Sequence, residues 1–273
     1  MGPEATKRGI MTATDNAIND GVDRSGEPVV RVRNMSKAFG GNQAVDDVSF
    51  EVYKGEILGV IGPNGCGKST LFNCALGQYV PDSGSVELRG VDVSKWSPPR
   101  RAKHGLARTF QLLQVFETMS VRDNLKTAAQ EHISTLPKRL FMAPDMGIDD
   151  KVDDLIERFR MAHLAEELAG NLSYGQQKLL DTAMALVSDP EVAFLDEPAG
   201  GVNLTMLGDV ERQIRDLNEN DGATMVIVEH NMEFIFALAH RIVVMSEGGV
   251  LMEGTPEEVR NDPQVVEVYL GGH

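Results

Sequence analysis

The sequence predicts an α/β fold, in which short buried strands alternate with helices. Two apolar runs, residues 56–61 and 191–195, have the length and composition of buried strands. A glycine-rich loop follows the first run, and two carboxylates follow the second. Since open parallel sheets bind ligands at the carboxyl ends of their strands, we expect both segments to lie at one edge of a sheet.

The glycine-rich loop, Gly62-Pro-Asn-Gly-Cys-Gly-Lys-Ser-Thr70, satisfies the phosphate-binding pattern G-x-x-x-x-G-K-[ST]. Glycines let backbone N–H groups turn inward around phosphate oxygens. Lys68 adds a point charge for the outer phosphates, and Ser69 offers a hydroxyl to Mg²⁺. Residues 69–76 are predicted to form a helix whose N-terminal dipole favours the anion. Seven residues are therefore expected to bind the nucleotide: Asn64, Gly65, Cys66, Gly67, Lys68, Ser69 and Thr70.

The two cysteines of the chain lie in this loop and in the helix after it, as Cys66 and Cys74. This placement disfavours a structural disulfide and favours a reducing compartment. The cation of Lys68 and the helix N-terminus both favour the thiolate of Cys66, so we expect a reactive thiol that MgATP protects. The alternative is a small buried residue that reagents do not reach.

The second strand ends in Asp196-Glu197-Pro198. Carboxylates at this place would face the phosphates bound by the loop. We expect Asp196 to hold Mg²⁺ and Glu197 to orient and polarise the water that attacks the nucleotide. Taken alone, the segment could also be a solvated acidic turn.

A third segment, Leu172-Ser-Tyr-Gly-Gln-Gln-Lys178, matches the Leu-Ser-Gly-Gly-Gln signature of ABC ATPases, with Tyr174 in place of the first glycine. It opens an apolar-periodic helix that Asp189-Pro190 ends. Over about residues 28–270, the chain resembles an ABC transporter ATP-binding subunit. The resemblance implies a P-loop ABC ATPase fold with a RecA-like core, an antiparallel β edge subdomain and a helical subdomain.

The same resemblance implies roles for other residues. Phe39 stands where the family stacks an aromatic ring on adenine. Gln111 ends the family's Q-loop, a catalytic and Mg²⁺-binding position, and His230 stands at its switch histidine. The positions that touch the γ-phosphate correspond to Ser173, Gly175 and Gln176. Taken alone, Phe39 could be ordinary core, Gln111 a surface residue and His230 a histidine at a strand end.

One phosphate loop and one signature occur in the chain. In the family the signature of one subunit closes on the phosphate loop of another, so two chains would enclose two ATP molecules. The implied partners are a second ATPase subunit, identical or a sister chain, separate membrane permease subunits and, indirectly, a periplasmic binding protein. The implied location is the cytoplasmic face of the bacterial inner membrane.

Tyr174 and the segment Ala199-Gly-Gly-Val-Asn203 depart from the general family pattern. Asn203 lacks the charge of the usual aspartate, which puts a polar contact across the dimer in doubt. Both variants, and the closing segments 253–259 and 269–272, resemble the longer ATPase subunit of branched-chain amino acid importers. The resemblance implies an ATP-hydrolysing motor for import of branched-chain or other hydrophobic amino acids.

Several other functions stay open at this stage. The same motor could serve a urea importer or a lipopolysaccharide exporter. A non-transport ABC ATPase of DNA repair or translation usually carries tandem cassettes, a coiled coil, a zinc insertion or basic surfaces. A nucleotide kinase would not need the signature.

The amino-acid composition narrows the choice among these functions. The 273 residues include 41 acidic and 26 basic side chains, a net charge of −15. This excess argues against nucleic-acid binding and against docking on anionic lipid. The sequence contains no run of about 18 apolar residues, the length that spans a bilayer. We therefore expect any pore to be formed by separate chains.

The chain divides into four parts. Residues 1–26 are predicted to be a disordered tail. Residues 27–111 would form the nucleotide-binding core with the antiparallel β subdomain, in which residues 29–33, 45–52 and 85–88 alternate like strands. Residues 112–170 would form the helical subdomain. Residues 171–273 would complete the signature helix and the core, and end in a C-terminal helix that a capping box at residues 255–258 opens.

The helical part contains two further patterns. The apolar residues Leu112, Leu113, Val115, Phe116 and Met119 could line a groove for a helix of the membrane subunit, or could be core. The second pattern is one apolar helix face, with acidic residues on the opposite side that we interpret as solvated rather than metal-binding. The apolar face consists of Val152, Leu155, Ile156 and Phe159, and the acidic side of Asp149, Asp150, Asp153, Asp154 and Glu157.

Overall fold

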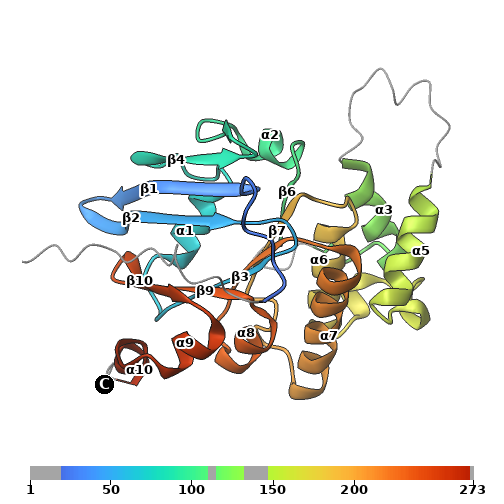
Figure 1. The fold of residues 1–273 in the computed structure, drawn as a ribbon. Coiled ribbons are helices and arrows are strands. Elements are labelled where there is room, and N and C mark those ends of the chain that lie inside the picture. Colours follow the sequence, from blue (N-terminus) through green and yellow to red (C-terminus); the bar gives the residue numbers. More distant parts are fainter. Residues whose placement is uncertain (1–19, 110–114, 132–146, 271–273) are drawn as a thin grey trace, which may run out of the picture.

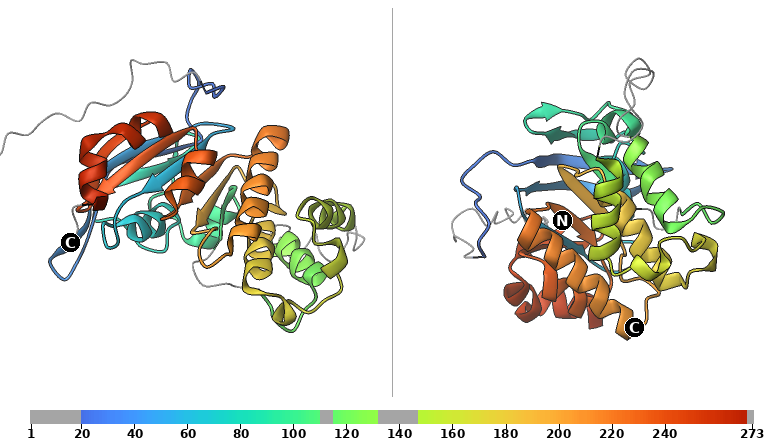
Figure 2. Two further views of the ribbon diagram at one scale, coloured as in Figure 1. Left: turned by 90° about the horizontal axis from the view of Figure 1, so that it is seen from below. Right: turned by 90° about the vertical axis from the view of Figure 1, so that its right-hand side faces the viewer.

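The computed structural model of the chain describes residues 20–109, 115–131 and 147–270. Two sheets form its centre, and a group of helices stands beside one end of them (Figure 1). In both further views α3 (Val121–Glu131) and α5 (Ile148–Arg158) lie far from α9 (Pro256–Asn261) and α10 (Pro263–Leu270) (Figure 2). This arrangement fits the predicted α/β core with a helical subdomain.

The smaller sheet is antiparallel, with strand order β2-β1-β4-β5. Its strands are β1 (Val30–Phe39), β2 (Asn42–Val52), β4 (Ser83–Leu88) and β5 (Val91–Asp92). In β1, Val30, Val32 and Met35 are buried while polar neighbours face outward. The predicted antiparallel edge sheet is present, and its strands extend beyond the predicted alternating segments.

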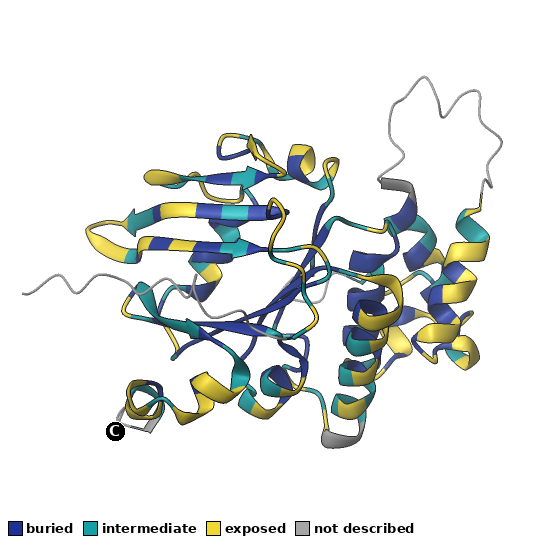
Figure 3. Cartoon of the chain, in the orientation of Figure 1, coloured by how far each residue is buried: buried dark blue, intermediate teal, exposed yellow. Residues whose placement is uncertain are grey.

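The larger sheet has strand order β10-β9-β3-β8-β7-β6. All its pairs are parallel except that of β10 with β9 at one edge. Every residue of the three central strands is buried, as in parallel sheets that are covered on both faces (Figure 3). The strands are β3 (Ile57–Ile61), β6 (Leu106–Arg108), β7 (Val192–Asp196), β8 (Met225–Val228), β9 (Arg241–Ser246) and β10 (Gly249–Gly254).

The larger sheet separates two hydrophobic cores, because successive side chains of a strand point to opposite faces. In β8, Met225 and Ile227 join the core shared with the helical part, whereas Val226 and Val228 join the core shared with the smaller sheet. The helices around the cores are α1 (Lys68–Ala75), α2 (Pro98–Ala102), α6 (Tyr174–Leu186), α7 (Leu204–Asp221) and α8 (Met232–Leu238).

In the helical part, short 3₁₀ turns at Ala162–Leu164 and Ala169–Asn171 lead from α5 to the signature. The predicted apolar face of α5, Val152, Leu155, Ile156 and Phe159, is buried. Acids of the opposite face form ion pairs with Arg122, Lys126 and Arg158. These contacts support the interpretation of the acidic cluster as a solvated helix face.

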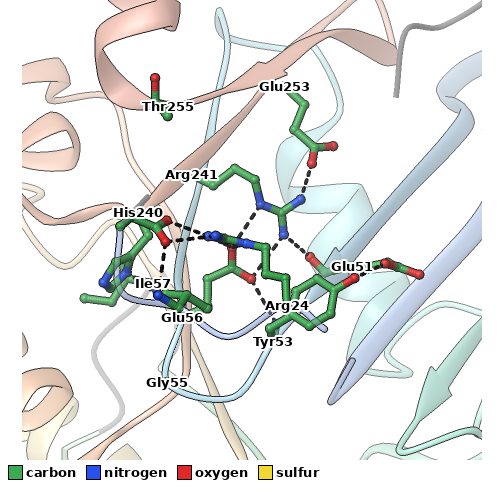
Figure 4. A network of polar contacts seen from close by, with 12 residues as sticks. Arg24, Glu51, Tyr53, Gly55, Glu56, Ile57, His240, Arg241, Glu253 and Thr255 are labelled. Carbon is green, nitrogen blue, oxygen red and sulfur yellow. Dashed lines mark hydrogen bonds and ion pairs between the residues drawn. The ribbon is translucent and has the colours of Figure 1, made fainter. Parts of the chain in front are cut away.

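Residues 20–26, which we expected to belong to a disordered tail, are attached to the core through Arg24. The Arg24 guanidinium donates to Glu56 Oε1 at 2.9 Å and to Asp20 Oδ2 at 2.6 Å (Figure 4). The tail prediction is therefore wrong for this stretch. Its earlier part, residues 1–19, lies outside the described residues.

The buried carboxylate of Glu56 is the reason why Arg24 binds to the core. This carboxylate is 0% exposed just before β3, and a buried charge must be paired and hydrogen-bonded. Arg241 Nε donates to it at 2.9 Å, and the backbone N–H of Tyr53 donates at 2.9 Å (Figure 4). Two arginines and a main-chain donor thus satisfy Glu56, and through Arg24 this carboxylate anchors the start of the described chain at the beginning of β3.

We predict that Arg24→Ala lowers the free energy of unfolding by about 2 kcal/mol, the scale of a hydrogen bond to a buried charge. The melting temperature would fall by about 4–8 °C. A matched control is Arg33→Ala, since Arg33 is more exposed and pairs with Glu87 on the surface. Calorimetry of both variants checks this prediction, and equal melting temperatures would contradict the anchoring role of Arg24.

Candidate functional site

Many of the expected nucleotide-binding residues line one open cavity of about 810 Å³. Its wall combines the phosphate loop, the ends of β1 and β2, and the segments after β7 and β8. The expected residues in this wall are Phe39, Asn64, Gly65, Gly67, Lys68, Ser69, Thr70, Glu197 and His230. The fold thus brings together residues that lie more than a hundred positions apart in the sequence.

The phosphate loop connects β3 to α1, as predicted. Gly65 and Gly67 adopt left-handed backbone conformations, with φ of 80° and 105°. A side chain at Gly67 would also collide with the carbonyl oxygen of Ala44, so this position requires glycine. Lys68 is buried, and its ammonium donates to the carbonyl oxygens of Gly62 at 2.7 Å and Pro63 at 3.0 Å. The positive charge therefore lies inside the loop, at the N-terminus of α1.

Cys66 turns away from the cavity. Its side chain is 4% exposed and belongs to the core shared with the smaller sheet. This burial contradicts our expectation of a reactive thiol and supports the alternative of a small buried residue. Cys74 is buried too, and desolvation raises the pKa of its thiol to about 11. Any contact of Cys66 with phosphate would come from its backbone.

Asp196 is the last residue of β7 and is 1% exposed. Arg108 Nη2 donates to its Oδ2 at 3.3 Å, whereas Oδ1 is buried with no hydrogen-bond partner in the described part of the chain. Burial raises the pKa of this carboxyl, and the nearby Arg108 opposes the rise. A buried carboxylate oxygen without a partner suits Mg²⁺, which prefers oxygen ligands.

Arg108 escaped the sequence analysis. It ends β6, donates to Asn73 Oδ1 in α1 at 2.7 Å, and also contacts Asp196. It therefore links the helix after the phosphate loop to the strand that ends in the two carboxylates. Its place three residues before Gln111 was visible in the sequence, but the pairing of β6 with β7 was not.

Glu197 and His230 meet at the cavity: Glu197 Oε1 lies 2.6 Å from His230 Nε2. Glu197 has a φ of 48°, which is unfavourable for a residue with a side chain. Three hydrogen bonds hold its backbone. The N–H donates to Val228 O at 2.9 Å, and the carbonyl accepts from Gly200 N at 2.9 Å and Lys178 Nζ at 3.3 Å. The conformation directs the carboxylate toward the histidine.

Phe39 ends β1 at the rim of the cavity and is 45% exposed. The alternative of ordinary core is therefore wrong. Its ring meets Tyr79 edge to face, with ring centroids 5.3 Å apart. Tyr79, which the sequence analysis missed, thus supports the ring from one side. An exposed aromatic face at the rim suits stacking on a base.

The signature residues do not line the cavity. Ser173 caps α6, where its Oγ accepts from Gln176 N, and Gln176 Oε1 accepts from Ser173 N at 2.9 Å. The two sequence departures, Tyr174 and the segment 199–203, lie together, since the Tyr174 ring packs against Gly201. Asn203 caps α7 by accepting from Met206 N at 3.0 Å, a role in which asparagine equals aspartate.

Three expected site residues, Ser173, Gly175 and Gln176, do not line the cavity. Gly175 lies in α6 against Met206, Ser173 is exposed and Gln176 is half-buried. Gln111 lies outside the described residues, and its expected role stays a prediction.

A second hollow of about 340 Å³ lies between the core and the helical part. Phe116 lines it with Pro98, Pro99 and Met184, so this residue of the expected docking groove is at its surface. Leu112 and Leu113 lie outside the described residues. In the parts of the chain that the structure covers, no helix combines the length and apolarity needed to cross a bilayer.

One edge of the larger sheet carries a phosphate loop, the buried carboxylate of Asp196 and the pair of Glu197 with His230. This combination defines a phosphate-loop nucleotide hydrolase. Residues 45–200 match the family model described as ABC transporter. Residues 250–273 match one described as branched-chain amino acid ATP-binding cassette transporter. The chain therefore belongs to the ABC transporter family, as an ATP-binding and ATP-hydrolysing subunit.

Similarity to individual proteins supports the same family. The chain is 36% identical to the high-affinity branched-chain amino acid transport ATP-binding protein LivG of Salmonella typhimurium, over 90% of this chain and 98% of the relative. It is 33% identical to the lipopolysaccharide export system ATP-binding protein LptB of Haemophilus influenzae, over 89% and 97%. A solved ATP-binding cassette of an ABC transporter in its ADP conformation is 32% identical, with a TM-score of 0.78, over 90% and 100%.

The burial of both cysteines predicts slow labelling. In the native chain, maleimide should modify Cys66 and Cys74 far more slowly than in the chain unfolded in guanidinium. The matched control is the variant Asn64→Cys/Cys66→Ala, because Asn64 is exposed in the same loop and lines the cavity. Its new thiol should react quickly and be protected by MgATP. Peptide mapping identifies the labelled cysteine, and rapid labelling of Cys66 in the native chain would contradict its buried position.

Proposed function

We propose that the chain is the ATP-hydrolysing motor of a membrane importer for branched-chain or other hydrophobic amino acids. The observation that carries the transported class is the match of residues 250–273 to the branched-chain amino acid family model. The 36% identity to LivG over nearly its whole length supports it. The proposed place of action is the cytoplasmic face of the bacterial inner membrane.

We propose the following roles for the residues in and around the cavity. Phe39 would stack on adenine, and the N–H groups of residues 64–70 would surround the phosphates, with Lys68 as the nearest positive charge. Ser69 and Asp196 would hold Mg²⁺, with Gln111 as a further ligand. When bound, this ion would neutralise charge on the phosphate oxygens. Asp196 Oδ1, which has no hydrogen-bond partner among the residues that the structure describes, is the atom that most favours this assignment.

Glu197 and His230, here called the catalytic pair, would act on the attacking water. Glu197 would orient and polarise that water, as a carboxylate at this place can do. His230, 2.6 Å from the carboxylate, would fix its orientation toward the cavity. The left-handed backbone of Glu197 supports the role, because strained conformations cluster at functional sites.

A second ATPase subunit would complete the site. Ser173, Gly175 and Gln176 lie outside the cavity of their own chain, while the cavity opens to solvent beside the phosphate loop. A partner's Ser173 hydroxyl, Gly175 N–H and α6 N-terminus would supply donors to the γ-phosphate. ATP would then join two chains, and hydrolysis would release them.

The other proposed partners are the further components of a transporter. Permease subunits would dock in the hollow lined by Phe116, Pro98, Pro99 and Met184, through an amphipathic helix. A periplasmic binding protein would act indirectly by delivering the solute to them. A lipopolysaccharide exporter is the second candidate, because the identity to LptB is 33%.

Uptake measurements test the transported class. Cells would express the chain with the permease, ATPase and binding-protein genes that neighbour its own gene. We predict ATP-dependent uptake of radiolabelled leucine that unlabelled isoleucine and valine reduce and urea does not. The Glu197→Gln variant is the inactive control. Active ATPase without amino acid uptake would contradict the importer proposal and leave the exporter as the better candidate.

We predict that Glu197→Gln lowers the ATPase kcat by about 10²-fold or more, the scale of lost general-base assistance, with ATP binding preserved. Because hydrolysis would no longer open the complex, light scattering should detect an ATP-dependent dimer. The double variant Ser173→Arg/Glu197→Gln is the control. It should bind ATP and stay monomeric, because the arginine would fill the partner's γ-phosphate position. Near-normal turnover of Glu197→Gln would contradict the role of Glu197.

A further inference from the structure

Glu229 is a buried carboxylate that the proposed function does not use. It follows β8, immediately before His230, and is 2% exposed. Its Oε1 accepts from Ala199 N at 2.7 Å, and its Oε2 accepts from His230 N at 2.9 Å and Asn231 N at 3.2 Å. The carboxylate is therefore held by three main-chain donors.

These three donors belong to the two segments that carry the catalytic pair. Ala199 follows Glu197 by two residues, and the other donors are His230 itself and its neighbour. The ladder between β7 and β8 ends where Asp196 pairs with Val228. Beyond it, Glu197 N donates to Val228 O, and then the Glu229 side chain takes the N–H of Ala199. The carboxylate thus continues the ladder where backbone pairing stops.

We propose that Glu229 is a positioning residue, which holds Glu197 and His230 in register for hydrolysis. This inference rests on the proposed function of the catalytic pair. The pair needs such support because Glu197 has an unfavourable left-handed backbone conformation, which persists only where the surrounding structure holds it. Displacement of a catalytic group by about 1 Å can cost about 10²-fold in rate.

The chemistry of the contact explains why glutamate is required. Both oxygens must act as acceptors, and three N–H donors suit an anionic carboxylate. Burial raises the pKa of Glu229, while its hydrogen bonds from Ala199, Asn231 and His230 oppose the rise. A glutamine keeps the shape, but its NH₂ group would face a main-chain N–H. An aspartate keeps the charge, but it is one methylene too short to reach both segments.

The test compares kinetic constants of the full chain. We expect Glu229→Gln to lower the ATPase kcat about 10-fold to 100-fold, with the KM for ATP and the Kd for ATP changed less than about 2-fold. The matched control is Glu253→Gln, which removes an ion pair to Arg241 remote from the cavity. It should lower the melting temperature and leave kcat unchanged. If Glu229→Gln does not fold, Glu229→Asp takes its place with the same expectation.

A double-mutant cycle separates positioning from stability. If Glu229 acts through the catalytic pair, Glu197→Gln/Glu229→Gln should be no slower than Glu197→Gln alone, because positioning no longer matters once the Glu197 carboxylate is gone. Rate losses that multiply, an unchanged kcat in Glu229→Gln, or a higher KM at constant kcat would overturn the inference. Its failure is distinguishable from that of the proposed function. An inactive Glu197→Gln beside a fully active Glu229→Gln overturns only the inference, whereas a fully active Glu197→Gln overturns the proposed function.

Discussion

The register of three central parallel strands is the constraint on which the site depends. Val228 of β8 pairs with Val60 on one side and with Asp196 on the other. The phosphate loop, the two carboxylates and the histidine each begin within two residues of this row. A slip of one residue would turn every side chain of a strand to the opposite face. The two hydrophobic cores, which take alternate side chains of the same strands, fix the register and so assemble the cavity.

Three buried carboxylates around this sheet differ in how far the protein satisfies them, and the difference separates their roles. Glu56 has two arginines and a main-chain donor, which makes it a structural anchor far from the cavity. Glu229 has three main-chain donors that join the segments of the catalytic pair. Asp196 has a 3.3 Å contact with Arg108, and its other oxygen has no hydrogen-bond partner among the described residues, which suits a ligand-binding role.

The start of the signature segment is held by contacts within its own chain. Its first residues are held locally, by the capping box of Ser173 with Gln176 and by the packing of Tyr174 over Gly201. The loop that follows Glu197 is thereby attached to the start of α6 within one chain. The two departures from the family pattern, at residues 174 and 203, thus have structural explanations: one packs on a glycine, and the other is an equivalent helix cap.

The sequence by itself determined the parts that depend on residues close together along the chain. The phosphate loop, the periodic face of α5 and the strand that ends in Asp196 all follow from local patterns, because backbone conformation and side-chain period are local properties. The family resemblance placed His230 at a functional position, but its contact with Glu197 was not predicted. Gln111 lies outside the described residues, so its role remains a prediction.

Only the tertiary structure decided the contacts between distant segments. The sequence suggested a reactive Cys66, yet packing against the smaller sheet buries it. Arg24 was assigned to a disordered tail, although it pairs with Glu56, 32 residues away. The sequence patterns did not indicate Arg108 or Glu229, because their partners come into reach only once β6, β7 and β8 align. Such contacts depend on strand register and on which face each side chain takes, and no local pattern encodes those.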